Sequence, residues 1–114
     1  MDGFFAAYLT GRTGTSVVLF ALRNGHVIGV DVGGLTYEGR FETKSDGTGF
    51  SCRLTYTVPA GGTLITGFGP APTPTPVTLP FDLPTNFAEG PIVRIETPMG
   101  PLNAKFAKLA DLDL

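Results

Sequence analysis

A two-residue alternation of apolar and polar side chains constrains the fold of this chain more than any other feature of the sequence. In residues 35–44, one set of alternate positions is largely apolar and the other is polar or charged. The alternation restarts at Phe50 and continues to Val58, after the turn-like segment Ser45-Asp46-Gly47-Thr48-Gly49. Because successive side chains of a strand point to opposite faces of a sheet, this pattern predicts an antiparallel hairpin with one face in a core.

Three further strands are predicted before this hairpin. Residues 15–23 are apolar on both faces, and Asn24-Gly25 connects them to a β-branched segment at residues 26–32. Asn-Gly is typical of the two-residue type I′ turn, whose central residues both need positive φ. Residues 3–12 form the first strand, so residues 3–58 are predicted to be a five-stranded meander with short connections.

The prolines divide the chain at Pro59. All ten lie between Pro59 and Pro101. The run at 70–76 has proline at alternate positions and cannot be a central strand, so we predict an extended Pro-rich loop at residues 69–76 that covers the surface. Residues 77–83 and 92–97 are predicted short strands. Residues 102–109 fit a helix or a strand, and we favour the strand.

These elements predict an all-β fold of about eight strands in one domain, residues 1–114. A sheet of this size buries its apolar face by closing into a barrel or by splitting into a sandwich. Sequential hairpins favour a single small antiparallel up-and-down barrel.

The charge composition argues against nucleic-acid binding. The chain has ten acidic and eight basic residues, a net charge of -2, and no Lys or Arg between Arg53 and Arg94, whereas nucleic-acid binders concentrate basic residues on one face. The apolar segment at residues 4–9 lacks a preceding basic region and is too short for a signal peptide. No apolar run approaches the roughly 20 residues of a membrane helix. We therefore expect a cytoplasmic protein that contacts neither nucleic acid nor membrane.

The residues whose side chains could take part in catalysis do not form a recognisable catalytic set. A Cys52–His26 nucleophile pair would require the fold to bring together the single cysteine and the single histidine, and we favour a solvated His26 after its turn. Asp31 lies between valines. In a structural role it accepts hydrogen bonds from the Gly33-Gly34 turn or faces solvent, and in a functional role it forms a carboxylate pair with Glu38 or Glu42; we favour the structural role. We expect no enzyme activity, no metal site and no cofactor.

The aromatic residues predict either a closed core or a ligand-binding interior. The chain has nine Phe, three Tyr and no Trp. An eight-stranded barrel can be filled by its side chains or can hold one small ligand. The candidates to line such an interior share the apolar face of the best-predicted hairpin: Tyr37, Phe41, Phe50 and Tyr56. The doubly apolar strand at 15–23 offers a candidate protein interface at Val18, Phe20 and Leu22.

Three short motifs occur in order in the first half of the chain. They are Asp2-Gly3-Phe4, the segment Leu22-Arg23-Asn24-Gly25-His26-Val27-Ile28-Gly29-Val30-Asp31, and Tyr37-Glu38-Gly39-Arg40-Phe41-Glu42, followed by a turn with Asp46-Gly47. In this order they resemble the GrlR-like family, small bacterial proteins related to a negative regulator of type III secretion genes. The resemblance covers roughly residues 2–58. It implies a lipocalin-like, eight-stranded β-barrel.

The resemblance also implies a regulatory role through protein contacts. The type member of that family is a cytoplasmic homodimer that silences a transcriptional activator without contacting DNA, and a run of acidic residues in one hairpin is linked to activator binding. The corresponding turn here, Ser45-Asp46-Gly47-Thr48-Gly49, has a single acidic residue, so neither that partner nor that site is carried over. We therefore expect a homodimeric regulatory protein with a protein partner, or, alternatively, a barrel that holds a small apolar ligand.

Overall fold

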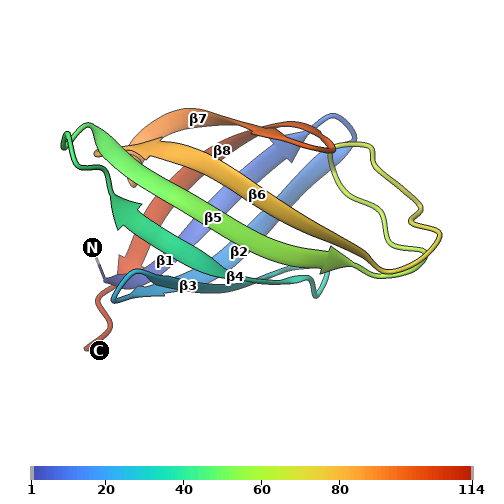
Figure 1. Ribbon diagram of the computed structural model, residues 1–114, viewed down its shortest axis with the longest axis horizontal. Helices are drawn as coiled ribbons and strands as arrows, with labels where there is room; N and C mark the ends of the chain where they lie inside the picture. Colours follow the sequence, from blue (N-terminus) through green and yellow to red (C-terminus); the bar gives the residue numbers. More distant parts are fainter. Residues whose placement is uncertain (1, 114) are drawn as a thin grey trace.

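The computed structural model describes residues 2–113, which form one antiparallel sheet that curls into a nearly closed barrel (Figure 1). The eight strands of this part of the chain are β1 (Gly3–Gly11), β2 (Gly14–Arg23), β3 (His26–Asp31), β4 (Thr36–Thr43), β5 (Gly49–Val58), β6 (Thr75–Pro84), β7 (Glu89–Thr97) and β8 (Gly100–Ala110).

The strand order confirms the predicted up-and-down barrel. The order across the sheet is β6-β5-β4-β3-β2-β1-β8-β7, so every hydrogen-bonded pair is antiparallel and all but β1–β8 are consecutive in sequence. The alternative of two stacked sheets is wrong, and so is the helical alternative for residues 102–109, which lie in β8. Asn24 and Gly25 both have positive φ, 50° and 79°, as the type I′ turn requires.

The prolines explain where the barrel stays open. β6 contains Pro76, Pro80 and Pro84, each four positions from the next, so their missing N–H groups fall on one edge of the strand. The ladder to β5 runs without a register shift from Thr75 to Pro84, so the donor-poor edge is the one that faces β7. The predicted Pro-rich loop is accordingly longer and displaced: residues 59–74 form the loop, and Thr75 and Pro76 already belong to β6.

Gly39 allows the sheet to coil. A Cβ atom at this position would lie 1.8 Å from the carbonyl oxygen of Arg53 on the neighbouring strand. The register between β4 and β5 has no shift there, so Gly39 marks a close backbone approach at a bend rather than a bulge.

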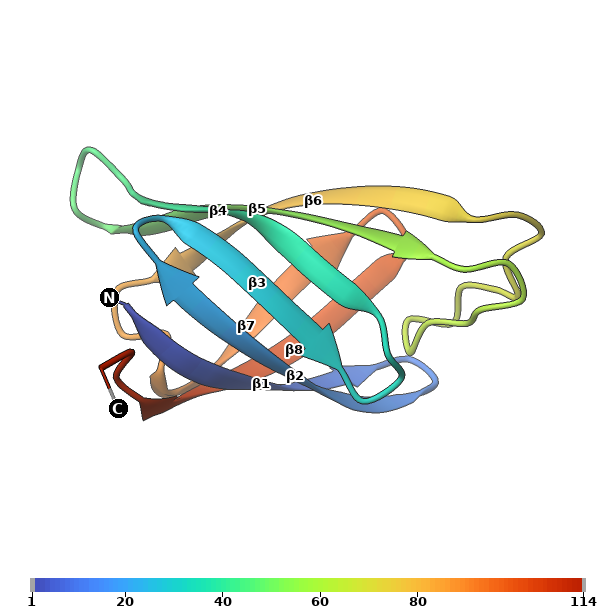
Figure 2. The same ribbon diagram turned by 90° about the horizontal axis from the view of Figure 1, so that it is seen from below.

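The two ends of the barrel are closed differently. Phe87, in the turn between β6 and β7, is 0% exposed and inserts into one end, with its ring 5.4–6.0 Å from the rings of Phe5, Phe41, Phe50 and Phe106. The loop at residues 59–74 extends beyond the opposite end, as both ribbon views show (Figures 1 and 2). Within residues 2–113 there is no helix long and apolar enough to cross a membrane.

Candidate ligand-binding cavity

A cavity of about 440 Å³ occupies the interior of the barrel. It extends from Leu83 and Phe87 at the plugged end to Thr15 and Thr66 at the loop-covered end. Most of its wall is apolar. The strands supply this apolar lining through Ala7, Leu9, Val18, Phe20, Leu22, Val27, Leu35, Phe41, Leu54, Leu79, Phe81, Leu83, Ile95, Leu102 and Phe106.

The polar lining side chains gather at the loop-covered end. Asp31 is the last residue of β3, Tyr37 is the second residue of β4, and Tyr56 lies two residues before the end of β5. The antiparallel meander brings these three strand ends to the same rim. The cavity is therefore polarised along its length, with aromatic rings at the plugged end and hydrogen-bonding groups at the rim.

Asp31 organises the rim. Its Oδ1 accepts hydrogen bonds from the backbone N–H groups of Gly33 and Leu35, both 2.9 Å, and its Oδ2 accepts a 2.9 Å bond from the Tyr37 hydroxyl. The interpretation of Asp31 as an acceptor for the glycine turn is thus confirmed. Three hydrogen bonds, two of them from backbone, also offset the cost of placing a carboxylate in a partly buried position.

Tyr37 and Tyr56 form a pair beside Asp31, with ring centroids 5.1 Å apart and an interplanar angle of 51°. Burial, with the hydrogen bond and the negative charge of Asp31 as further causes, raises the pKa of Tyr37 well above its ordinary value. Burial also raises the pKa of Tyr56. Both phenols therefore stay protonated at neutral pH and act as hydrogen-bond donors.

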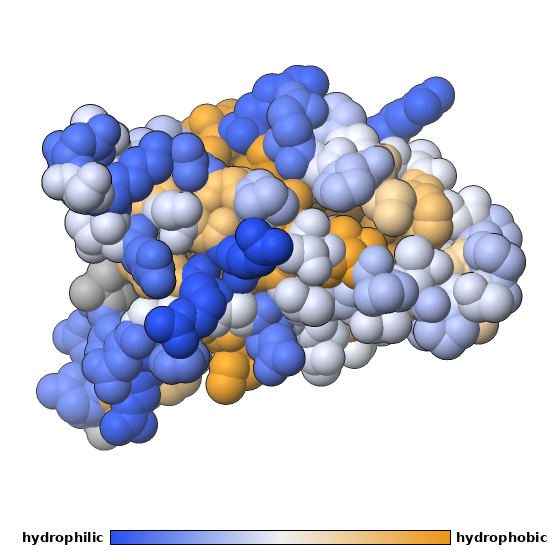
Figure 3. Space-filling model, in the orientation of Figure 1, coloured by the Kyte–Doolittle hydropathy of each residue, from blue (hydrophilic) through white to orange (hydrophobic). Residues whose placement is uncertain are grey.

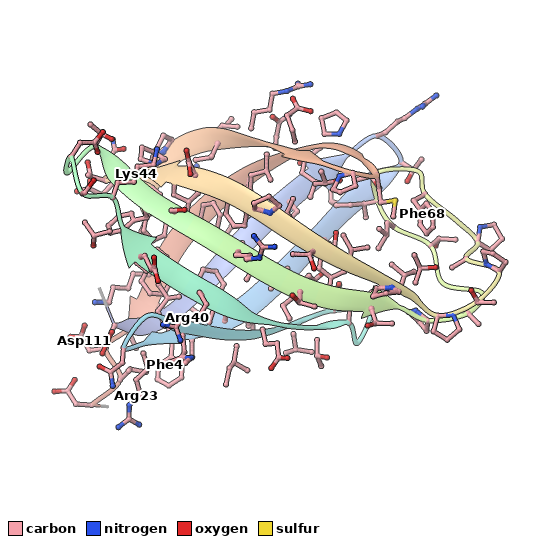
Figure 4. The ribbon with its side chains drawn as sticks, in the orientation of Figure 1. Phe4, Arg23, Arg40, Lys44, Phe68 and Asp111 are labelled. Atoms are coloured by element: carbon pink, nitrogen blue, oxygen red, sulfur yellow. The ribbon has the colours of Figure 1, made fainter. Side chains whose placement is uncertain are left out.

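The loop at residues 59–74 is held over the rim by hydrogen bonds to the turn between β1 and β2. The backbone N–H of Thr13 donates to the carbonyl of Ile65 at 2.7 Å, and the Thr13 hydroxyl donates to the same oxygen at 3.0 Å. Phe68 packs against the core from this loop and lies between the loop and the strand ends in Figure 4. Leu64 and Ile65 line the cavity, so the loop forms the roof of the cavity.

One hydroxyl under this roof, that of Thr66, is buried without a hydrogen-bond partner among the described residues. Thr66 is 7% exposed, and the atom without a partner is its Oγ1. Buried polar groups nearly always have a partner because an unmade hydrogen bond costs free energy. Thr66 is thus a locally unfavourable group in an otherwise apolar part of the roof.

The four residues predicted to line a ligand-binding interior all point inward. Tyr37, Phe41 and Tyr56 line the cavity. Phe50 lies deeper in the core, stacked on Phe41 with ring centroids 4.5 Å apart. The expectation of an inward-facing aromatic set is met for the side-chain directions, and their contact with a ligand stays a prediction.

The residues predicted to form a protein interface do not lie on the outer surface. Val18 and Leu22 are buried, and both line the cavity together with Phe20. The outer face of the same strand carries an apolar surface instead, three cross-strand rows deep over β1, β2 and β3. We call it the outer apolar patch. Its rows are Phe4, Ala21 and Ile28; Leu19 and Val30, with Ala6 buried beside them; and Tyr8 and Val17, with Val32 at the mouth of the cavity.

The proposed reactive pairs are not brought together. Cys52 is buried and faces the cavity, whereas His26 is exposed on the outer face of β3, 3.4 Å from the guanidinium of Arg40. Glu38 and Glu42 are exposed on β4, on the face opposite to the one that Tyr37 and Asp31 share. In residues 2–113 no three His, Cys, Asp or Glu side chains are grouped to hold a metal ion.

On the face that Figure 3 shows, hydrophilic side chains are unevenly distributed along the barrel. Figure 3 shows hydrophilic side chains concentrated over the end that carries the two termini and the β4–β5 turn, and a more mixed surface over the loop-covered end. The labelled Arg23, Arg40 and Asp111 in Figure 4 belong to the hydrophilic end, away from the roof of the cavity.

No family model, no curated protein and no solved structure matches this chain.

Proposed function

We propose that this protein is a non-enzymatic binding protein that holds a small apolar ligand inside its barrel. The observation that supports the proposal most directly is the cavity of about 440 Å³. Small-molecule sites span roughly 300–1,000 Å³, are mostly apolar, and carry a few polar groups that fix the orientation of the ligand. The barrel interior has all three properties.

The physical cost of the empty space supports the same proposal. Side chains in protein cores normally fill their volume, and each unfilled part of a core lowers stability. Here the cavity runs between large residues that leave it open, including Phe20, Phe41 and Phe106. A ligand that occupied this space would recover the lost contacts and the hydrophobic free energy of its own burial.

The proposal is tested with N-phenyl-1-naphthylamine, an uncharged apolar dye whose fluorescence rises in a dry environment. We expect saturable binding with one site per chain. The variant Leu54→Trp adds bulk to the cavity wall and should weaken dye binding at least tenfold. Native mass spectrometry of the purified protein, followed by denaturation, would additionally detect a ligand carried from the cell.

A matched control separates cavity filling from general damage. Thr55 is the next residue of β5 and is exposed on the outer face, so Thr55→Trp should leave dye binding unchanged. Dye fluorescence that fails to saturate in the wild-type protein, or equal loss in both variants, would refute ligand binding in the barrel.

The outer apolar patch favours a second function, regulation through protein contacts as a homodimer, which the resemblance to the GrlR-like family also implies. Leu19, Ile28 and Val30 are 52%, 69% and 44% exposed. Contiguous exposed apolar surface of this kind marks interaction sites. Lys105 borders the patch on β8 and Glu38 borders it on β4, so the apolar residues are flanked by one basic and one acidic side chain.

The homodimer is tested by sedimentation at micromolar concentration. We expect a dimer for the wild-type protein and a monomer for Leu19→Lys, because a charge in the centre of a buried apolar interface is costly. Thr57→Lys, on the exposed face of β5, serves as the control and should remain dimeric. A wild-type monomer would remove this second function and leave the ligand proposal standing.

A further inference from the structure

The charge of the cavity restricts which apolar molecules fit it. Among the described residues of its lining, Asp31 is the one residue with a carboxyl side chain, and no Lys, Arg or His is present. A carboxylate or phosphate group entering this space would lose its hydration, meet no cation, and be repelled by Asp31. The site therefore disfavours anionic amphiphiles such as fatty acids.

The rim nevertheless offers hydrogen bonds to a neutral group. Tyr56 is 8% exposed and lines the cavity; of the two phenols at the rim, Tyr37 is the one whose hydroxyl donates to a protein group of residues 2–113. The hydroxyl proton of Tyr56 is thus free to be donated to an acceptor inside the cavity. Unlike Thr66 Oγ1, the Tyr56 hydroxyl is not fully enclosed, so a group inside the cavity can reach it.

Asp31 has one acceptor position left. A carboxylate accepts about four hydrogen bonds, and three are used by Gly33, Leu35 and Tyr37. Two of those three fall on Oδ1, so the free position is on Oδ2, next to the Tyr37 hydroxyl. The Tyr37 hydroxyl is bonded to Asp31 and its ring lies against the Tyr56 ring, so Asp31 and Tyr56 both contact Tyr37 at the rim.

A single hydroxyl group of a ligand can use both positions: its oxygen accepts the Tyr56 proton and its own proton goes to Oδ2 of Asp31. An ammonium group can donate to Oδ2 of Asp31 and to the Tyr56 oxygen, but it must give up the hydration of a full charge to enter an apolar cavity. The remainder of the ligand must be apolar and elongated, because the cavity leads from this rim to the rings of Phe41, Phe87 and Phe106.

We infer that the ligand is a long-chain alcohol or another elongated neutral molecule with a terminal hydroxyl group, bound with that hydroxyl between Tyr56 and Asp31 and with its apolar chain directed at Phe87. This inference rests on the proposed function and specifies the ligand class of the same cavity. It assigns to Asp31 a second role as the residue that excludes anions.

The test is displacement of bound N-phenyl-1-naphthylamine at pH 7 by three molecules of the same chain length: 1-decanol, decanoate and decylamine. We expect 1-decanol to displace the dye at a concentration at least tenfold below that of decanoate, and below that of decylamine. Equal or tighter binding of decanoate or decylamine would overturn the inference, although dye binding itself, and with it the proposed function, would stand.

Two variants assign the preference to residues. Asp31→Asn preserves acceptors for the Gly33 and Leu35 N–H groups but removes the charge, and it should improve displacement by decanoate at least fivefold. Tyr56→Phe should raise the 1-decanol concentration needed at least fivefold without changing dye affinity. Tyr8→Phe, at a tyrosine 50% exposed on the outer face, is the matched control and should change neither.

Two results with these variants would contradict the inferred ligand class. If Asp31→Asn leaves the ratio of decanoate to 1-decanol unchanged, Asp31 does not exclude anions and the inference fails. If Tyr56→Phe binds 1-decanol as the wild type does, the hydroxyl of the ligand is not bound at this rim. Dye affinity measured for each variant shows that the barrel itself is intact.

Discussion

The hydroxyl of Tyr37 donates a 2.9 Å hydrogen bond to Oδ2 of Asp31 across the rim of the barrel. Asp31 ends β3 and Tyr37 begins β4, so this bond joins the two strands across their turn, while Oδ1 binds the backbone of the turn itself. One carboxylate therefore fixes the turn conformation, the end of the sheet and the orientation of a cavity-lining ring.

Tyr37→Phe tests the contribution of this bond to stability. The substitution retains the ring beside Tyr56 and removes the donor to a charged acceptor, and hydrogen bonds to charged groups contribute up to about 3 kcal/mol. Because Asp31 is only partly buried, water can replace the lost donor, and we expect a decrease of about 1–2 kcal/mol in the free energy of unfolding, measured with urea. A change equal to that of the surface variant Tyr8→Phe would contradict this role.

Alkaline pH should destabilise the barrel in two stages. Burial raises the pKa of the Cys52 thiol from 9.0 to about 12, with the negative charge of Asp82 as a second cause, and it raises the pKa of Tyr37 and Tyr56 above 10.0. In the unfolded chain these groups ionise at their ordinary values. Their contribution to stability is therefore complete below about pH 9 and is lost as the pH rises toward the folded-state values.

Urea denaturation between pH 7 and pH 11 measures this loss. Each group that ionises only in the unfolded chain lowers the free energy of unfolding by about 1.4 kcal/mol per pH unit. Cys52→Val should remove the stage that begins near pH 9 and leave the tyrosine stage that begins near pH 10. A wild-type protein whose stability is constant to pH 11 would show that the thiol and the phenols ionise equally in both states.

The directions of the side chains were harder to predict than the strands. Alternation and Asn24-Gly25 predict the hairpins because each is a local signal. Residues 17–22 are apolar on both faces, so their pattern does not distinguish inside from outside, and the predicted interface residues Val18, Phe20 and Leu22 face the cavity. The two-residue turn determines which face of this strand is buried. It pairs Leu22 with Val27, and Val27 pairs with Gly39, which is on the same face as Phe41.

The roof and the plug could not be predicted from local pattern. The position of Ile65 depends on a hydrogen bond to Thr13, 52 residues away, and Phe87 sits in a turn whose sequence is not apolar around it. Both are tertiary contacts that form only when the strands have been paired. The cavity lies between these two elements. From the sequence alone we could therefore predict only that the interior is either filled by side chains or open to a ligand.

Phe87→Ala should open the plugged end of the barrel. The side chain is 0% exposed and contacts four other phenylalanine rings, and truncation of a buried Phe costs about 3–5 kcal/mol. We expect a loss in this range in urea denaturation, with added dye or 1-decanol restoring part of it by filling the enlarged space. Phe4→Ala, at a ring 37% exposed on the outer face, should cost clearly less.

Gly39→Ala should be one of the most damaging single-methyl additions in the chain. The new Cβ would lie 1.8 Å from the carbonyl oxygen of Arg53, so β4 and β5 would have to separate, at a cost of about 3 kcal/mol or more. Gly14→Ala is the matched strand control, because its Cβ would meet no atom closer than 3.8 Å. Similar melting temperatures for the two variants would contradict the close approach of the backbones.

Thr66→Val should stabilise the protein, in contrast to the other substitutions. Valine has nearly the shape of threonine, and it removes a hydroxyl that is buried without a partner, a situation that costs about 1–3 kcal/mol. We expect a gain of about 1 kcal/mol in the free energy of unfolding and unchanged dye affinity. Thr63→Val, at an exposed position of the same loop, should have no effect. A destabilised Thr66→Val would mean that the hydroxyl is hydrogen-bonded in solution, and the roof over the cavity would then be anchored by Thr66 as well as by Thr13.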